Sequence, residues 1–60
     1  METIIRSVVL CCSIVMMNTA INKRVMLEKQ AGYELVREPY CKNVDSDGCE
    51  VYLTFYTVVD

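Results

Sequence analysis

Near its C-terminal end the chain alternates between apolar and more polar positions. From residue 49 onward, one side of the repeat carries Cys49, Val51, Leu53 and Phe55, and the other carries Glu50, Tyr52, Thr54 and Tyr56. A period of two is typical of a β-strand that has one face on the core. A turn signal at residues 45–48 comes directly before it, and residues 33–41 read as another strand. Together these segments predict a β-hairpin.

The register of this hairpin decides which side chains share a face. With residues 45–48 as the loop, Val44 lies opposite Cys49. The core face then carries Val36, Tyr40, Val44, Val51, Leu53 and Phe55, and the other face carries Leu35, Arg37, Cys41, Tyr52, Thr54, Tyr56 and Val58. A slip of one residue would exchange these faces. Pro39 cannot donate a hydrogen bond to a neighbouring strand, so its strand is expected at an edge or with a bulge.

An apolar run near the N-terminus allows two interpretations. In the first, residues 3–12 form a strand buried on both faces, because they are rich in β-branched side chains. An amphipathic helix follows, with its apolar side formed by Met16, Met17, Ala20, Ile21, Leu27 and Ala31 and interrupted by Arg24 and Glu28. Ser13 or Thr19 is the expected N-cap, and Gly32 is the expected C-terminal cap.

In the second interpretation, residues 1–21 form a secretory signal or a membrane anchor. Arg6 precedes the apolar run, and Ala20 is a candidate cleavage position. However, Asn18 occupies a position where a cleavage site needs a small residue, and the uncharged stretch is shorter than the ~20 apolar residues of a membrane span. We therefore favour a cytoplasmic protein without a membrane segment. An exported or membrane-anchored protein stays the alternative.

These elements predict a single α+β domain over residues 1–60 with the order βαββ. A strand–helix–strand unit prefers a right-handed crossover. This preference favours a three-stranded sheet in which the last strand is central, between the first strand and the strand that contains Pro39. One helix covers one face of that sheet.

The junction between the helix and the next strand, Leu27-Glu28-Lys29-Gln30-Ala31-Gly32-Tyr33-Glu34-Leu35-Val36, resembles a known signature. It is similar to a family of short, uncharacterised bacterial and phage domains whose helix ends in Gly-Trp-Glu-Leu-Val. This chain has Tyr33 where the family usually has Trp, and Lys29 where many members carry an extra Gly. The resemblance implies the βαββ order and no particular activity, since the family has none established.

Composition narrows the classes of function. The chain has 60 residues, of which 53% are hydrophobic, and a net charge of −2. It contains no His, so it lacks the usual general base and the commonest metal ligand. Its six basic residues are scattered and form no electrostatic footprint for direct binding of nucleic acid. We therefore expect a protein that is not an enzyme and has no cofactor.

The cysteines and an acidic loop are the remaining candidates for chemistry. Structural zinc needs cysteine pairs spaced by about two to four residues, which this chain lacks. Cys41 and Cys49 bracket the hairpin loop and suit a disulfide only in an exported protein, so free thiols are expected. Residues 43–48 resemble the first half of a calcium loop, but Thr54 occupies the position of the closing glutamate. A hairpin turn without a metal is the expectation.

A tyrosine stripe is the feature most suggestive of function. It comprises Tyr52, Thr54 and Tyr56, with Leu35, Arg37 and Val58 beside it. Tyrosine and arginine are enriched at interface hot spots, and a single helix covers only one sheet face. We therefore predict that these six residues form an interface, for a second copy in a homodimer and for another protein. The homodimer could form by sheet-to-sheet packing or by pairing of edge strands.

The leading hypothesis is thus a non-catalytic protein-interaction module that self-associates. A phage or mobile-element accessory protein that inhibits a host defence complex, in the manner of an anti-CRISPR, suits a small acidic chain without catalytic chemistry. Two alternatives stay open. One is a small exported or single-pass membrane protein, and the other is an oligomer that binds a small ligand at its interface.

Overall fold

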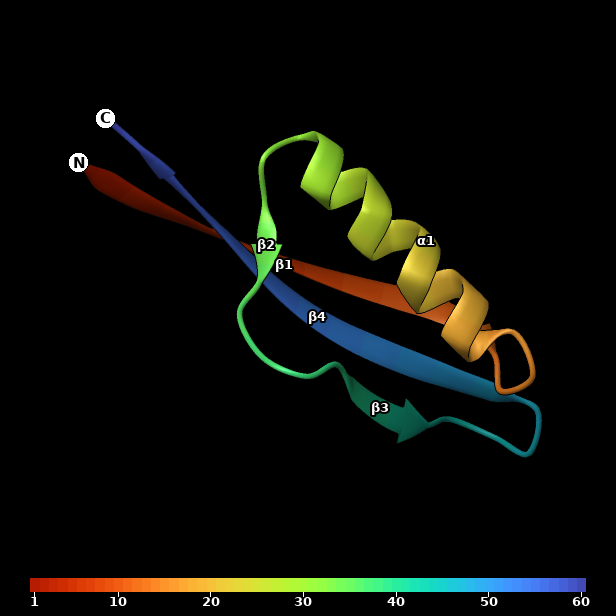
Figure 1. Ribbon diagram of the computed structural model, residues 1–60. Helices are drawn as coiled ribbons and strands as arrows, with labels where there is room; N and C mark the ends of the chain where they lie inside the picture. Colours follow the sequence, from red (N-terminus) through yellow and green to blue (C-terminus); the bar gives the residue numbers. More distant parts are fainter.

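The computed structural model describes residues 1–60 and combines one helix with an antiparallel sheet (Figure 1). Its elements, in chain order, are β1 (Glu2–Ser13), α1 (Met17–Gln30), β2 (Glu34–Leu35), β3 (Tyr40–Asn43) and β4 (Gly48–Val59). The predicted α+β class is confirmed. Residues 1–21 form a strand, a short turn and the beginning of the helix. None of the helical structure is both long and apolar enough to cross a membrane.

β4 lies in the middle of the sheet. β1 pairs with it along its whole length, from Glu2 opposite Val59 to Ser13 opposite Gly48. β2 and β3 pair with successive parts of β4 on its other side. The sheet therefore has four strands, and the prediction of three was wrong in this detail. The extra break occurs at Pro39, which has no N–H to donate and lies between β2 and β3.

The hairpin of β3 and β4 differs by one residue from the predicted register. Asn43, and not Val44, lies opposite Cys49. Because successive side chains alternate between faces, the slip moves Tyr40 away from the core side and brings Cys41 onto it. The predicted faces are therefore wrong for this strand, although they are right for β4.

Turn chemistry is the physical reason for the slip. Val44 donates its N–H to the carbonyl of Gly48, so these two residues close the hairpin across a loop formed by residues 45–47. One carboxylate oxygen of Asp45 accepts hydrogen bonds from the N–H groups of Asp47 (2.9 Å) and Gly48 (2.6 Å). Such an Asx turn favours a tight loop, one residue shorter than the predicted one.

The core lies between β4 and α1. Its buried apolar side chains are the alternating residues of β4 that the sequence predicts: Cys49, Val51, Leu53 and Phe55. The side chains packed around them from β1 and α1 are Val8, Leu10, Cys12, Met17, Ile21 and Val25. Met17 and Ile21 of the helix therefore pack against the core as expected, and Val25 packs there as well. Leu27, predicted on the apolar side, is 56% exposed.

A buried ion pair accounts for the orientation of the helix. The side chain of Glu28 is only 4% exposed, and Arg6 Nη1 donates to both of its carboxylate oxygens, at 3.0 and 3.3 Å. Arg24 Nη2 lies 3.1 Å from the same carboxylate. The Arg6 guanidinium also stacks over the ring of Tyr33, 4.3 Å from its centroid. Because a buried carboxylate needs charged partners, α1 presents Glu28 to β1 and leaves Leu27 in solvent.

Gly32 ends α1 as predicted, with a φ of +91°. Its N–H donates to the carbonyl of Lys29, and the N–H of Tyr33 donates to the carbonyl of Glu28. This pair of bonds is the Schellman arrangement, which needs a residue in the left-handed region at the position of Gly32. It directs the chain from the helix into β2.

The start of α1 differs from both predicted N-caps. Met16 occupies the N-cap position, and no side chain caps the helix. Ser13 acts one turn earlier, where its hydroxyl oxygen accepts a hydrogen bond from the N–H of Met16 at 3.3 Å. Thr19 lies within the first turn of the helix.

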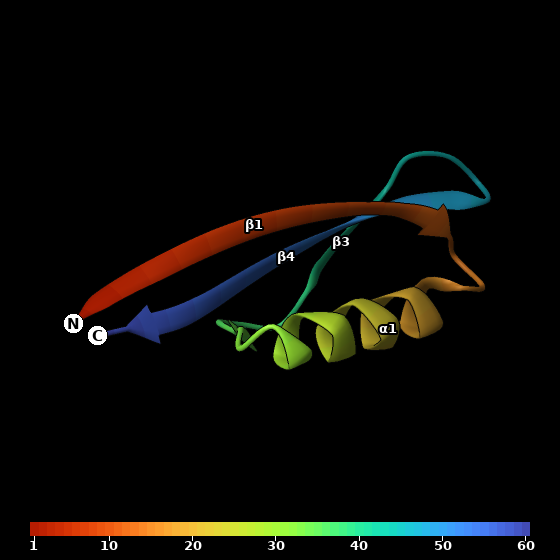
Figure 2. The ribbon, with the colours of Figure 1, turned by 90° about the horizontal axis from the view of Figure 1, so that it is seen from above.

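The helix covers one face of the sheet only, as Figure 2 shows. The strand β1 is therefore not buried on both faces, as its composition had suggested; Val8, Leu10 and Cys12 are its half-buried residues and the others are exposed. Beyond the end of α1, the first residues of β1 and the last of β4 continue as a two-stranded ribbon that carries both chain termini (Figure 1). The molecule is accordingly long and thin, with extents of 45 × 17 × 14 Å.

Candidate functional site

The sheet face opposite α1 has no covering element, and we call it the open face. Residues that lie directly opposite in an antiparallel register share a face, which assigns its members. They are Thr3, Ile5, Ser7, Val9 and Cys11 of β1, Glu34 of β2, Tyr40 and Lys42 of β3, and Glu50, Tyr52, Thr54, Tyr56 and Val58 of β4. Ile5, Val9 and Tyr40 are each more than half exposed. Monomeric proteins rarely expose large contiguous groups of apolar side chains, and such a group usually marks a binding site.

A pair of tyrosines joins the outer strand β3 to the central strand β4 on the open face. Tyr40 and Tyr52 lie opposite each other, with ring centroids 5.9 Å apart and ring planes inclined by 45°. The hydroxyl of Tyr52 donates to a carboxylate oxygen of Glu50 at 3.2 Å. The charge of Glu50 and this hydrogen bond raise the pKa of Tyr52 above its ordinary value, which favours the neutral phenol further. The pair therefore presents aromatic surface with a neutral hydroxyl that is already oriented.

The structure brings together four of the six residues predicted for the interface. Tyr52, Thr54, Tyr56 and Val58 lie side by side along the open face of β4. Leu35 does not join them, because it lies opposite Phe55 and packs against the core.

Arg37 also lies apart from the stripe. It is exposed in the connection between β2 and β3 and belongs to neither strand. The one-residue slip in register and the break at Pro39 explain why sequence reasoning assigned Leu35 and Arg37 to the stripe.

Three large apolar or aromatic side chains of the open face were missed. Ile5 and Val9 lie opposite Tyr56 and Tyr52, and Tyr40 lies on the other side of Tyr52. The signal for Ile5 and Val9 was present in the sequence, because they occupy alternate positions of a strand that the single helix covers on one face only. Tyr40 could be placed only with the register.

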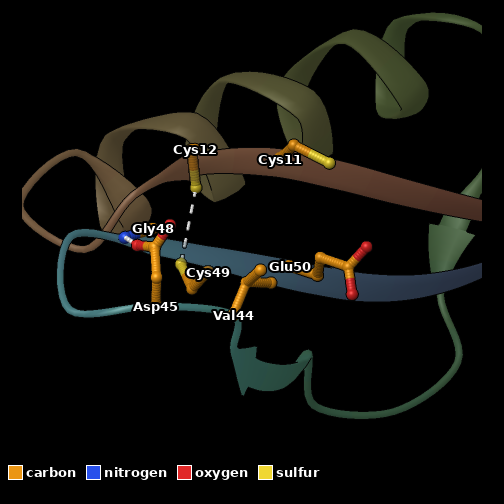
Figure 3. Close-up of a pocket in the computed structure, with 7 residues that line it drawn as sticks. All are labelled: Cys11, Cys12, Val44, Asp45, Gly48, Cys49 and Glu50. Carbon is orange, nitrogen blue, oxygen red and sulfur yellow. Dashed lines mark hydrogen bonds between the residues drawn. The ribbon is translucent and has the colours of Figure 1, made fainter.

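At the end of the sheet where β4 begins, several thiols lie beside the acidic turn formed by residues 45–47. Cys12 and Cys49 lie opposite each other and point toward one another, with their sulfur atoms 3.8 Å apart (Figure 3). Burial raises the pKa of the Cys49 thiol, and the contact with Cys12 adds to the effect. All four cysteines are free thiols in the structure. A raised pKa makes Cys49 a poor nucleophile at neutral pH.

The acidic turn itself acts as structure. Hydrogen bonds from the N–H groups of Asp47 and Gly48 lower the pKa of the Asp45 carboxyl group. Both carboxylate bonds close the hairpin, and no group of three or more acidic or cysteine side chains is arranged to hold a metal ion. The loop is thus the Asx turn that the sequence predicts, shortened by one residue.

Two hollows lie at this end of the molecule. One, of about 200 Å³, is lined by both thiols of the Cys12–Cys49 pair and by Asp45. The other, of about 220 Å³, lies between β1 and α1. Both are smaller than the ~300–1,000 Å³ that sites for small molecules usually occupy.

Comparison of the chain with models of known families, with curated proteins and with solved structures gives no match. The resemblance to the short bacterial and phage domains therefore stays a prediction from residues 27–36.

Proposed function

We propose that the protein is a non-catalytic interaction module that self-associates and binds another protein through its open face. One observation carries the proposal. The sheet is covered on one side only, and five of the 60 residues are buried. A domain of this size has a marginal core, and such domains usually gain stability from a staple or from a partner.

The chemistry of the open face supports a protein partner. The face combines the aromatic rings of Tyr40 and Tyr52 with the aliphatic side chains of Ile5 and Val9, and it carries the charged side chains of Lys42 and Glu50 toward one end. Protein interfaces combine aromatic and apolar side chains with polar ones in the same way. Tyrosine in particular supplies a large contact area at a low cost in side-chain entropy.

The sheet also supplies a rigid support for this surface. Tyr52, Thr54 and Tyr56 belong to the central strand, whose alternate side chains fill the core. Their backbone positions are therefore set before any partner binds, which lowers the entropy that binding must overcome. A setting in a phage or mobile element, with a host defence complex as the target, remains part of this proposal.

The test compares two variants that differ in position and share the same new side chain. Tyr52→Lys places a charge on the open face, and Met26→Lys places one on α1, where Met26 is already 63% exposed. Tagged wild-type and variant chains are incubated with lysate of the source cells, and retained proteins are quantified by mass spectrometry. We expect at least one protein that is retained by the wild type and by Met26→Lys and is lost with Tyr52→Lys. Equal retention by all three chains, or no retained protein, would contradict the proposal.

A further inference from the structure

The outer edge of β1 carries unpaired backbone groups at known positions. Val36 donates its N–H to the carbonyl of Thr54, and Val44 donates its N–H to the carbonyl of Gly48. Even-numbered residues of β4 therefore direct their backbone groups toward β2 and β3, and odd-numbered residues direct theirs toward β1. The β1 residues opposite the even-numbered ones have groups that face away from the sheet. These residues are Thr3, Ile5, Ser7, Val9 and Cys11.

This edge has little of the usual protection against strand pairing. β1 runs over 12 residues, Glu2–Ser13, without a proline or a lysine. Its one inward-pointing charge is Arg6, a type of residue that can protect an edge, but here the carboxylate of Glu28 pairs with it. Long apolar edge strands with so few protective features tend to pair with other strands.

The cover above β1 also extends to only part of the strand. α1 lies over the half of β1 that ends at Ser13, and the half that begins at Glu2 projects past the end of the helix (Figure 1). In that projecting half, Ile4 is on the core side of the sheet and yet 40% exposed. At the other half, the hollow of about 220 Å³ lies between β1 and α1 and is lined by Leu10, Ala20 and Leu27 among others.

One antiparallel register between two copies of β1 brings the projecting half of each copy against the hollow of the other. If two copies of β1 pair about a twofold axis at Ser7, the strand overlaps itself over nearly its whole length. Ile4 of each copy then lies opposite Leu10 of the other, on the side of the helix, and enters the hollow beside Leu27. Glu2 lies opposite Cys12, where Lys23 and Arg24 line the same hollow. Opposite charges therefore meet at both ends of the paired strands.

The neighbouring registers are less favourable for electrostatic reasons. A twofold axis at Arg6 sets the two Arg6 side chains opposite each other. An axis at Val8 places Arg6 opposite Leu10, in the hollow that already holds Lys23 and Arg24. Like charges that face each other across paired strands are destabilising. The axis at Ser7 avoids both conflicts.

We infer that the protein forms a dimer by antiparallel pairing of β1 with β1 of a second copy, about an axis at Ser7. The two sheets become one continuous sheet, each helix covers the projecting half of the other copy, and the two open faces join into one surface. This inference rests on the self-association in the proposed function and specifies its geometry. It leaves the open face free for a different protein.

Amide hydrogen exchange tests the edge directly. The N–H groups of Thr3, Ile5, Ser7 and Val9 face solvent in a monomer and are bonded in the inferred dimer, whereas those of Ile4 and Val8 are bonded to β4 in both. We expect the first group to become protected, at least tenfold, as the protein concentration rises through the dissociation constant. The second group should be protected throughout and serves as the internal control.

Matched variants test whether the hollow between β1 and α1 takes part in the dimer. Leu27→Lys changes an exposed residue that lines it, and Met26→Lys changes its equally exposed neighbour that does not. Size-exclusion chromatography with light scattering should show a dissociation constant at least tenfold weaker for Leu27→Lys and unchanged for Met26→Lys. Lys23→Glu should weaken the dimer as well, and the addition of Glu2→Lys should restore it. Far-UV circular dichroism checks that each variant folds.

The outcomes separate the geometry from the function. A dimer in which the odd-numbered β1 amides exchange as fast as in the monomer overturns the edge pairing and leaves self-association intact. A chain that stays monomeric overturns both the edge pairing and self-association. Binding of another protein by the open face is then tested by the Tyr52→Lys comparison alone. A dimer with protected edge amides and a selective effect of Leu27→Lys supports the inference.

Discussion

The ion pair between β1 and α1 predicts an asymmetry between its two partners. Glu28 is 4% exposed, whereas the side chains of Arg6 and Arg24 are 46% and 36% exposed. Arg6→Met leaves a buried carboxylate with one partner, while Glu28→Met leaves two guanidinium groups that water can reach. The first substitution should therefore destabilise the fold more than the second, although both remove the same ion pair.

The loss in free energy of unfolding follows from the contacts that each substitution removes. Hydrogen bonds to charged groups contribute about 1.5–3 kcal/mol. A cation–π contact such as that of Arg6 with Tyr33 adds ~0.5–1 kcal/mol at a partly exposed site. Because Arg6 is half exposed, we take the lower end of these ranges and expect about 2 kcal/mol for Arg6→Met. For Glu28→Met we expect ~1 kcal/mol or less, since methionine also fills the vacated apolar space.

These differences are large for a chain of this length. A free energy of unfolding of ~0.05–0.15 kcal/mol per residue is usual, so 2 kcal/mol is a substantial fraction of the total. The midpoint of thermal unfolding should fall by about 8–16 °C for Arg6→Met. Unfolding in urea gives the free energy of unfolding and unfolding on heating gives the thermal midpoint, both followed by far-UV circular dichroism. All chains are compared at one protein concentration, because self-association makes the midpoint depend on it.

A double-mutant cycle completes the test. Once Glu28 is methionine, replacing Arg6 should cost little more than the loss of its stacking on Tyr33. The double variant should thus be close in stability to Glu28→Met alone. Equal costs for the two single variants, or additive costs in the double variant, would refute the reasoning that burial of the carboxylate dominates this contact.

Three further predictions concern the turns and the thiols. Gly32→Ala should lower the free energy of unfolding by about 1–2 kcal/mol in urea titrations, because an alanine must adopt the left-handed φ of +91°, and Gly32→Asn should cost less. The pKa of Asp45 is lower in the folded chain than its ordinary value of 3.8, so its stabilising contribution is present above pH 3.8 and is lost as the pH falls. Stability from pH 2 to 6 should therefore show a smaller pH dependence in Asp45→Asn, which keeps the accepting oxygen; an unchanged profile would exclude this role. Cys49 is 3% exposed and has a raised pKa, so iodoacetamide at pH 8 should alkylate Cys11 and Cys41 before Cys49, as peptide mass spectrometry can show.

Features that depend on a few neighbouring residues were predicted from the sequence. The alternation from Cys49 to Phe55 identified the buried side of β4, because the side-chain period of a strand is a local property. Gly32 identified the end of the helix, since a left-handed residue is needed there. The signal at residues 45–48 identified a turn, although its length was one residue too long.

Features that depend on contacts between distant residues were predicted less well. The side of α1 that faces the sheet is set by the pairing of Glu28 with Arg6, which lies 22 positions away in the chain. Glu28 interrupts the predicted apolar side, yet it is the buried residue of the helix. Its burial depends on a partner that only the fold brings close. The hairpin register is a local exception, because the exposed Asp45 carboxylate accepts from N–H groups two and three residues further along the chain.

The candidate site shows the same division. Tyr52 and Tyr56 could be assigned to one face because they share a strand, and the structure places both on the open face. Leu35 could not, because it reaches the sheet through β2, and the break at Pro39 separates β2 from β3. Ile5 and Val9 could have been assigned as well, because they alternate along a strand that one helix covers on one face only, but the composition of that strand predicted burial on both faces.

The mass of the protein in solution shows whether the chain associates with itself. The chain has a mass of 6.9 kDa, and only five of its residues are buried. We therefore expect it to associate at high concentration. Sedimentation equilibrium over a wide range of concentrations should show a reversible change from this mass to twice this mass. A mass of 6.9 kDa at every concentration, up to the millimolar range, would contradict the claim that this half-covered sheet is built to associate.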